Sequence, residues 1–331
     1  MQTLIEKFPF QLRDAVEAVA QIHILPHDFE IRNICIFGMG GSGIGGKFVK
    51  DMLCSTSKLP IEVYNGYEIP KFIDKHTLVI ASSYSGNTEE TVSNVQALLS
   101  SQAKIVCITS GGALLDIAKH NSLEFVQLPS GSRSPRAFLG YSIVCQLGVL
   151  KELKLIDSSV LEQVKVAIDL LIFEQEDIKV KSHQIAQSMA HKLPLMYTSE
   201  RMESVSIRWR QQINENAKML CHQLVFPEMN HNEIEGWNSA QDKTLVVLLR
   251  NKDDHKRNQL RFEIVKDQLK HKTSSIIEIY SKGQSLVEKM MYLTHFGDWV
   301  SYYLAVVQHI DPISIGMIDH LKNELSKNEN L

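Results

Sequence analysis

Three hydroxyl side chains and a glycine stand close together in one short segment of the sequence: Ser83, Ser85, Gly86 and Thr88. The apolar run 77–81 before them predicts a buried parallel strand, and residues 89–95 after them predict the start of a helix. A helix N-terminus presents unpaired N–H groups and the positive end of its dipole, which favour an anion. An ordinary capped turn needs only one hydroxyl, so three of them favour a site for a phosphate monoester.

A glycine-rich segment upstream, residues 38–46, has the same setting between a predicted strand at 33–37 and a predicted helix at 47–53. It contains Gly41 and Ser42. Glycines allow the backbone to approach a ligand closely. Two such loops at the carboxyl ends of neighbouring parallel strands predict one phosphorylated ligand in the crevice between them.

The glycine spacing of this segment also fits a dinucleotide site, with glycines at Gly38, Gly40 and Gly43. A dinucleotide site needs an acidic residue near the tip of the next strand to hold a ribose, whereas Glu62 lies early in that strand. It would also leave the hydroxyl-rich segment without a role. The spacing alone therefore does not outweigh the phosphate interpretation, and no cofactor is expected.

Charged and titratable side chains in three other segments are candidates for catalysis. Glu215 lies between two asparagines at the end of a helix predicted to begin near Glu203, where the alternative is a solvated helix terminus. His231 also lies between two asparagines, and histidine can move protons near neutral pH, although a surface loop histidine is the alternative. Arg133 and Arg136 lie at a predicted helix start, where a guanidinium suits a phosphate or an enolate oxygen; the alternative is a surface cation.

The composition excludes several classes of protein. The chain has 331 residues with 44% hydrophobic and 22% charged residues, and its net charge of −3 favours neither nucleic acid nor an anionic membrane as a partner. The first residues lack the apolar core of a signal peptide, and the longest apolar stretch, 137–150, is too short and too polar to span a bilayer. The five cysteines are scattered and predict a reduced, cytoplasmic protein, and neither they nor the 13 histidines have metal-site spacing.

Strand-like and helical runs alternate in both halves of the chain. The predicted strands are residues 33–37, 61–64, 77–81, 104–109, 124–128, 195–198, 244–249 and 274–280. Near-continuous apolar strands with helices between them predict parallel sheets covered on both faces. A helical stretch at 135–191, broken near 156–158 and 174–177, separates a domain at 1–152 from one at 153–331. Two further helices, 285–308 and 314–327, flank a break at Asp311-Pro312.

Five motifs occur in one order along nearly the whole chain: residues 38–43, 83–88, 134–137, 214–218 and 230–233. Together they resemble the bifunctional phosphoglucose/phosphomannose isomerase family, whose members carry two sugar-isomerase (SIS) domains. The resemblance implies an α/β fold of two flavodoxin-like domains and a homodimer with shared active sites. It implies no metal and no nucleotide. The implied reaction interconverts glucose 6-phosphate or mannose 6-phosphate with fructose 6-phosphate.

The resemblance also implies roles for individual residues. The phosphate would be held by Gly41, Ser42, Ser83, Ser85 and Thr88. Glu215 would carry a proton between C1 and C2 through a cis-enediol, and Arg136 would stabilise the enediolate. His231 would help to open the sugar ring from the partner subunit, and Lys322 would be the C-terminal active-site lysine. This division of labour agrees with the chemistry, because hydrogen transfer beside a carbonyl needs one carboxylate and an oxyanion stabiliser.

One position departs from the family pattern. Members often carry a threonine just after the Asp-Pro pair that is thought to help accept both epimers, and here Asp311-Pro312 is followed by Ile313 and Ser314. Ser314 can substitute for that threonine, so the resemblance supports glucose activity more directly than mannose activity.

Other functions fit parts of the pattern. One is an SIS enzyme acting on another sugar phosphate, although an amidotransferase would need a glutaminase domain with an N-terminal cysteine. Another is a non-catalytic SIS protein that senses a sugar phosphate, which would usually carry a helix-turn-helix domain and a basic patch. This chain is expected to begin almost directly with its first β/α unit, which favours the isomerase.

Overall fold

The first half of the chain is built on a five-stranded parallel sheet. The computed structural model describes residues 1–132, 134–239 and 242–327, so Arg133 lies outside the described residues. The strands lie in the order β2-β1-β3-β4-β5, the flavodoxin-like order. Their bounds are β1 Asn33–Phe37, β2 Ile61–Tyr64, β3 Thr77–Ser83, β4 Lys104–Thr109 and β5 Glu124–Gln127.

Alternate residues of these strands enter two different cores, because successive side chains of a strand point to opposite faces. Ile34, Ile36 and Ile80 pack on the side of α3 Gly40–Leu53 and α6 Leu139–Glu152. Cys35 and Val79 pack on the side of α4 Glu89–Leu98 and α5 Gly112–His120. The sheet is therefore covered on both faces, as predicted.

The second half repeats this plan with a smaller parallel sheet in the order β7-β6-β8-β9. The strands are β6 Leu193–Ser199, β7 His222–Phe226, β8 Thr244–Arg250 and β9 Ile276–Tyr280. One face packs on α9 Lys256–Leu269. The other face packs on α7 Ser159–Met189, α8 Glu203–Ala217 and α10 Leu286–Val307.

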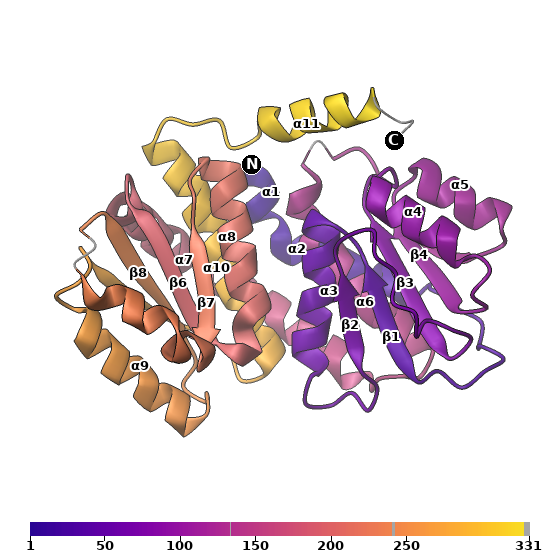
Figure 1. The fold of residues 1–331 in the computed structure, drawn as a ribbon, viewed down its shortest axis with the longest axis horizontal. Coiled ribbons are helices and arrows are strands. Elements are labelled where there is room, and N and C mark those ends of the chain that lie inside the picture. The colour runs from indigo at the N-terminus through magenta and orange to yellow at the C-terminus, as the bar shows by residue number, and fades with distance from the viewer. Residues whose placement is uncertain (133, 240–241, 328–331) are drawn as a thin grey trace.

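A single core joins the two halves, since α3, α6, α7, α8 and α10 all contribute to it (Figure 1). Helices α3 and α8 run antiparallel across this core. Asp51 near the end of α3 accepts a hydrogen bond from the Ser204 amide at the start of α8, 2.9 Å away. The beginning of α3, which follows β1, must consequently lie beside the end of α8, which carries Glu215.

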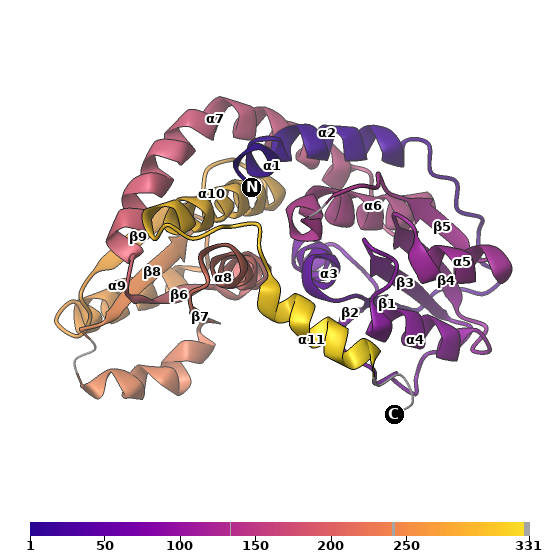
Figure 2. The ribbon, with the colours of Figure 1, turned by 90° about the horizontal axis from the view of Figure 1, so that it is seen from above.

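The C-terminal helix α11 Gly316–Ser326 extends from the second half of the chain across to the first (Figures 1 and 2). None of its residues is buried, and Met317 is 90% exposed. Asp311-Pro312 separates it from α10, as predicted. In the described part of the chain, no helix is both long and apolar enough to cross a membrane.

Four details of the sequence-based prediction are wrong. Strand β7 was not predicted, because it is a half-exposed edge strand with a short apolar run. Helix α7 has no break at 174–177, because its polar residues there are paired: buried Glu174 contacts Lys282 at 2.6 Å, and Asp177 contacts Lys181 at 2.7 Å.

The other two errors concern helix starts. Helix α3 begins at Gly40, so most of the glycine-rich segment is helical rather than a loop. Two helices, α1 Gln2–Glu6 and α2 Phe8–Val19, precede β1. Helix α2 packs on α6 and α7 through residues spaced at the helical period. The domain boundary after residue 152 stays a prediction, and it falls between α6 and α7.

Candidate active site

The carboxyl edge of the first sheet brings the glycine-rich and hydroxyl-rich segments together. Strands β1 and β3 are hydrogen-bonded neighbours, with Phe37 paired to Ala81 at their ends. The Tyr84 amide donates to the Ser42 hydroxyl at 3.3 Å, which connects the two segments directly. A Cβ atom added at Gly41 would lie 3.4 Å from the Cα of Arg136, so both segments adjoin the third motif.

The hydroxyls of residues 83–88 are arranged inside a tight turn. Ser83 is buried, and its hydroxyl lies 2.8 Å from that of Thr88 while accepting from the Gly86 amide at 3.1 Å. Gly86 has a φ of +72° and lies against Gly111, so a side chain there would be strained and would clash. Ser85 is exposed, so it lies on the solvent side of the turn, while Thr88 is half-buried and its hydroxyl faces that of Ser83.

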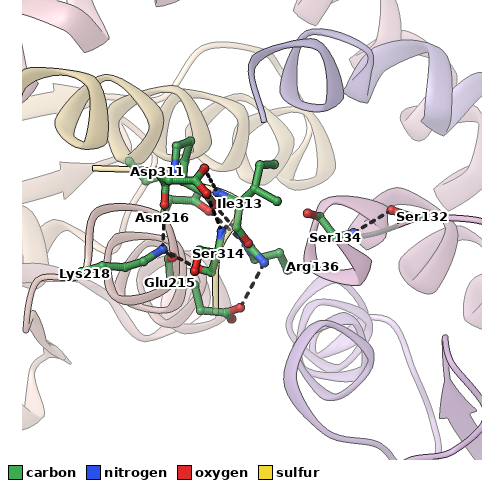
Figure 3. Close-up of polar contacts among 11 residues, drawn as sticks. Ser132, Ser134, Arg136, Glu215, Asn216, Lys218, Asp311, Ile313 and Ser314 are labelled. Atoms are coloured by element: carbon green, nitrogen blue, oxygen red, sulfur yellow. Dashed lines mark hydrogen bonds and ion pairs between the residues drawn. The ribbon is translucent and has the colours of Figure 1, made fainter. Parts of the chain in front are cut away.

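Arg136 connects the two halves of the molecule. It lies in the 3-10 helix η1 Pro135–Phe138 and is only 5% exposed. Its Nε donates to Asn216 Oδ1 at 3.0 Å, and one terminal nitrogen donates to the carbonyls of Pro312 and Ile313 at 2.5 and 3.3 Å (Figure 3). The guanidinium is therefore fixed between α8 and the turn that precedes α11.

The other terminal nitrogen of Arg136 faces the carboxylate of Glu215. Arg136 Nη1 lies 3.6 Å from Glu215 Oε2, an ion pair that is longer than a normal hydrogen bond (Figure 3). Burial lowers the pKa of Arg136, and the charge of Glu215 opposes that effect. The Glu215 side chain is 28% exposed, so this pair is open to solvent on the carboxylate side.

Helix α8 holds Glu215 in place through buried polar contacts with α10. Arg208 makes a two-bond ion pair with Asp298, at 3.0 and 2.9 Å, and both side chains are buried. Asn216 donates to the Ser301 hydroxyl at 3.0 Å while accepting from Arg136. The contacts with α10 therefore fix the backbone of α8 at Glu215. Asn216 fixes Arg136, the charge partner of Glu215.

Two predicted site residues, His231 and Lys322, make no described contact with this pair, whereas Ser314 lies in the turn beside it (Figure 3). His231 ends the 3-10 helix η3 Glu228–His231 beside β7 and is exposed. Lys322 is exposed on α11. The Ser314 side chain is exposed, although its backbone carbonyl accepts from Lys218 at 2.6 Å.

Glu233 belongs to a separate cluster next to β7. Its carboxylate accepts from the Tyr197 hydroxyl and lies 2.7 Å from His222 Nε2. Burial and this carboxylate raise the pKa of Tyr197. Among the residues that the structure describes, no three His, Cys, Asp or Glu side chains are grouped as a metal site would require.

Sequence reasoning missed two residues that contact the Arg136–Glu215 pair, Asn216 and Lys218. Both lie in the motif 214–218, in which only Glu215 was assigned a role. Polar side chains at the end of a helix that is otherwise buried were the available signal. The arrangement therefore places the two kinds of group that proton transfer and oxyanion stabilisation use, a carboxylate and a buried cation, next to the glycine- and hydroxyl-rich edge of the first sheet.

Comparison with known proteins decides the family. Residues 29–124 match the SIS domain, and residues 178–325 match the bacterial phospho-glucose isomerase C-terminal SIS domain. The bifunctional phosphoglucose/phosphomannose isomerase of Caldicellulosiruptor bescii is 38% identical over 98% of both chains. The chain belongs to the bifunctional phosphoglucose/phosphomannose isomerase family.

A second member of this family, from Aquifex aeolicus, is 36% identical over 89% of this chain and 91% of its own. The isomerase class and the SIS fold expected from the sequence are therefore confirmed. The C-terminal domain of glucosamine-fructose-6-phosphate aminotransferase from Francisella tularensis has the same fold as this phosphoglucose/phosphomannose isomerase family member. It has a TM-score of 0.76 and 14% identity, and covers 94% of this chain and 97% of its own.

Proposed function

We propose that this chain interconverts glucose 6-phosphate, and also mannose 6-phosphate, with fructose 6-phosphate. The observation that carries the proposal is the Arg136–Glu215 pair at 3.6 Å, next to the glycine- and hydroxyl-rich edge of the first sheet. Full-length similarity to family members named for these two isomerase activities supports it.

The base in this proposal is Glu215. Its carboxylate would remove the proton from C2 of the open-chain aldose and return it to C1 of the cis-enediol, so that one group serves both carbons. A carboxylate that is partly exposed and fixed at a helix end can reach both positions.

The oxyanion stabiliser is Arg136. Three of its five N–H groups point to Asn216, Pro312 and Ile313, which leaves the two N–H groups of Nη1 for the enediolate oxygen. A preorganised cation at this place needs little rearrangement when negative charge develops. The phosphate would be bound by Gly41, Ser42, Ser83, Ser85 and Thr88, at a distance that fixes the sugar carbons near Glu215.

The remaining roles require a second subunit, and we propose a homodimer. His231 would reach the partner's site to open the sugar ring, which fits its exposed place on η3. Exposed apolar side chains on α11, including Leu321 and Leu325, support contact with another chain. Ser314 and Lys322 would complete the site, Ser314 beside the epimeric carbon.

A cytoplasmic location is supported by the five free cysteines.

The activity is tested by incubating the purified protein with each hexose 6-phosphate and following the products by NMR. We expect fructose 6-phosphate from both aldoses, and both aldoses from fructose 6-phosphate. No turnover of any of the three by folded protein would refute the proposed function and favour a sugar-phosphate sensor. Turnover of only the glucose epimer would refute the mannose part.

The phosphate site gives a separate prediction. The double variant Ser85→Ala/Thr88→Ala should raise the KM for fructose 6-phosphate by at least about a hundredfold, because each of the two charge-assisted hydrogen bonds contributes about 1.5–3 kcal/mol. The kcat should change much less, since Glu215 is untouched. Steady-state kinetics measures both constants.

A matched control for this variant is Ser101→Ala. Ser101 lies just beyond the C-terminal end of α4, opposite to Ser85 and Thr88, and donates its hydroxyl to the Leu98 carbonyl at 2.7 Å. Its KM should remain that of the unmodified protein. An unchanged KM in the folded double variant would remove the phosphate from residues 83–88.

A further inference from the structure

The ammonium group of Lys218 is surrounded by backbone carbonyls at the edge of the candidate site. Its Nζ donates to the carbonyl of Glu215 at 2.6 Å, of Asp311 at 3.1 Å and of Ser314 at 2.6 Å (Figure 3). Lys218 itself follows the last residue of α8 in the left-handed conformation, with φ at +55°. An ammonium has three donors, so all of them are used.

One of these carbonyls belongs to the helix that carries the proposed base. The last carbonyls of a helix have no partner within it, and a cation there also opposes the negative end of the dipole. Lys218 satisfies the Glu215 carbonyl in this way. The other two carbonyls belong to residues 311–314, so the same ammonium joins the end of α8 to that turn.

The 311–314 turn is held from its other side as well. The carboxylate of Asp311 accepts from the amides of Ile313 and Ser314 at 2.9 and 3.3 Å, and these bonds lower the pKa of Asp311. Arg136 donates to the carbonyls of Pro312 and Ile313. The turn thus lies between the cations of Lys218 and Arg136, and Arg136 also faces the Glu215 carboxylate.

We propose that Lys218 is a positioning residue that holds the Glu215 end of α8 and the 311–314 turn at a fixed separation, and through them sets the geometry of the Arg136–Glu215 pair. Lys218 has no donor left for the substrate, so it acts through its neighbours. The kinetic part of this inference rests on the proposed function. A misplacement of about 1 Å can cost about a hundredfold in rate.

The test compares the unmodified protein with Lys218→Met, whose unbranched side chain is of similar length but has no N–H donor. We expect kcat for fructose 6-phosphate to fall by about a hundredfold and KM to stay within about threefold, because the phosphate-binding edge belongs to the other sheet. Lys270→Met is the control: Lys270 also ends a helix, α9, and pairs with exposed Asp267. It should leave both constants unchanged.

Chemical rescue separates positioning from a general loss of stability. Lys218→Gly keeps the left-handed conformation, which glycine adopts readily, and removes the ammonium. We expect n-butylammonium to restore kcat in a saturable manner, while tetramethylammonium, which has no N–H, does not. Restoration by both cations, or by neither, would overturn the role assigned to the three hydrogen bonds.

A readout without substrate keeps this inference independent of the proposed function. Hydrogen exchange of the Ile313 and Ser314 amides should accelerate in Lys218→Met, while the amides of β3 keep their protection. Unchanged exchange at both amides would overturn the inference. A fall in kcat with unchanged exchange would also overturn it, because Lys218 would then act on the substrate directly. If the unmodified protein turns over no hexose phosphate, the proposed function fails and the exchange result still decides the inference.

Discussion

Glu215→Gln should lower kcat by about 10²–10⁴, the usual contribution of a general base, with only a modest change in KM. Glutamine keeps the shape of the side chain and its place at the end of α8, but it cannot accept a proton from carbon. Solvent deuterium incorporation at C1 or C2 of the sugar should disappear together with turnover. Steady-state kinetics and NMR of the recovered sugar phosphates in D₂O measure these two effects.

Glu203→Gln provides the control for this prediction. Glu203 lies at the opposite end of the same helix and is exposed, so the variant removes a carboxylate without reaching the site. Its kcat should be that of the unmodified protein. Turnover of the Glu215→Gln variant at the unmodified rate would move the base elsewhere, and Glu233, bonded to Tyr197 and His222, would be the next candidate.

Mixed dimers of Glu215→Gln and His231→Ala chains should recover activity that neither parent has. If His231 serves the partner's site in a two-fold dimer, one site of the mixed dimer contains both substitutions and the other site contains neither. Random reassembly makes about half of the dimers mixed, so about a quarter of the sites are intact. Activity should therefore rise to about a quarter of that of the unmodified protein, measured after dissociation and reassembly.

Each parent taken through dissociation and reassembly alone is the control and should stay at its own low activity. If His231 serves its own chain, every site in every dimer carries one lesion, and mixing changes nothing. That result would overturn the shared site while leaving Glu215 as the base. Within one described chain, His231 lies beside β7 and the Arg136–Glu215 pair beside the first sheet, an arrangement that the shared site would explain.

The strands were predictable because their signal is local. Five strands of the first half were found within two residues of their observed ends, since buried parallel strands are continuous apolar runs. The helix that carries Glu215 was placed correctly from Glu203 onward. Strand β7 was not predicted, because an edge strand is paired on one side only and needs less apolar sequence.

That the glycine-rich and hydroxyl-rich segments are neighbours was also predictable, because the carboxyl ends of neighbouring parallel strands meet at one edge of a sheet. Their internal geometry was not. Sequence alone does not show that Ser83 bonds to Thr88, or that α3 begins inside the glycine-rich segment. Hydroxyls and glycines are compatible with both a loop and the first turn of a helix.

The sequence by itself determined the family, the two parallel sheets and the residue types of the site, since each of these depends on the order of residues along the chain. Only the tertiary structure decided which residues meet. Arg136 contacts Asn216 and Ile313, residues far apart in sequence, because α3 and α8 run antiparallel in a shared core. The same packing brings the 311–314 turn onto Lys218. Contacts of this kind depend on how helices pack, and no local pattern of residues encodes them.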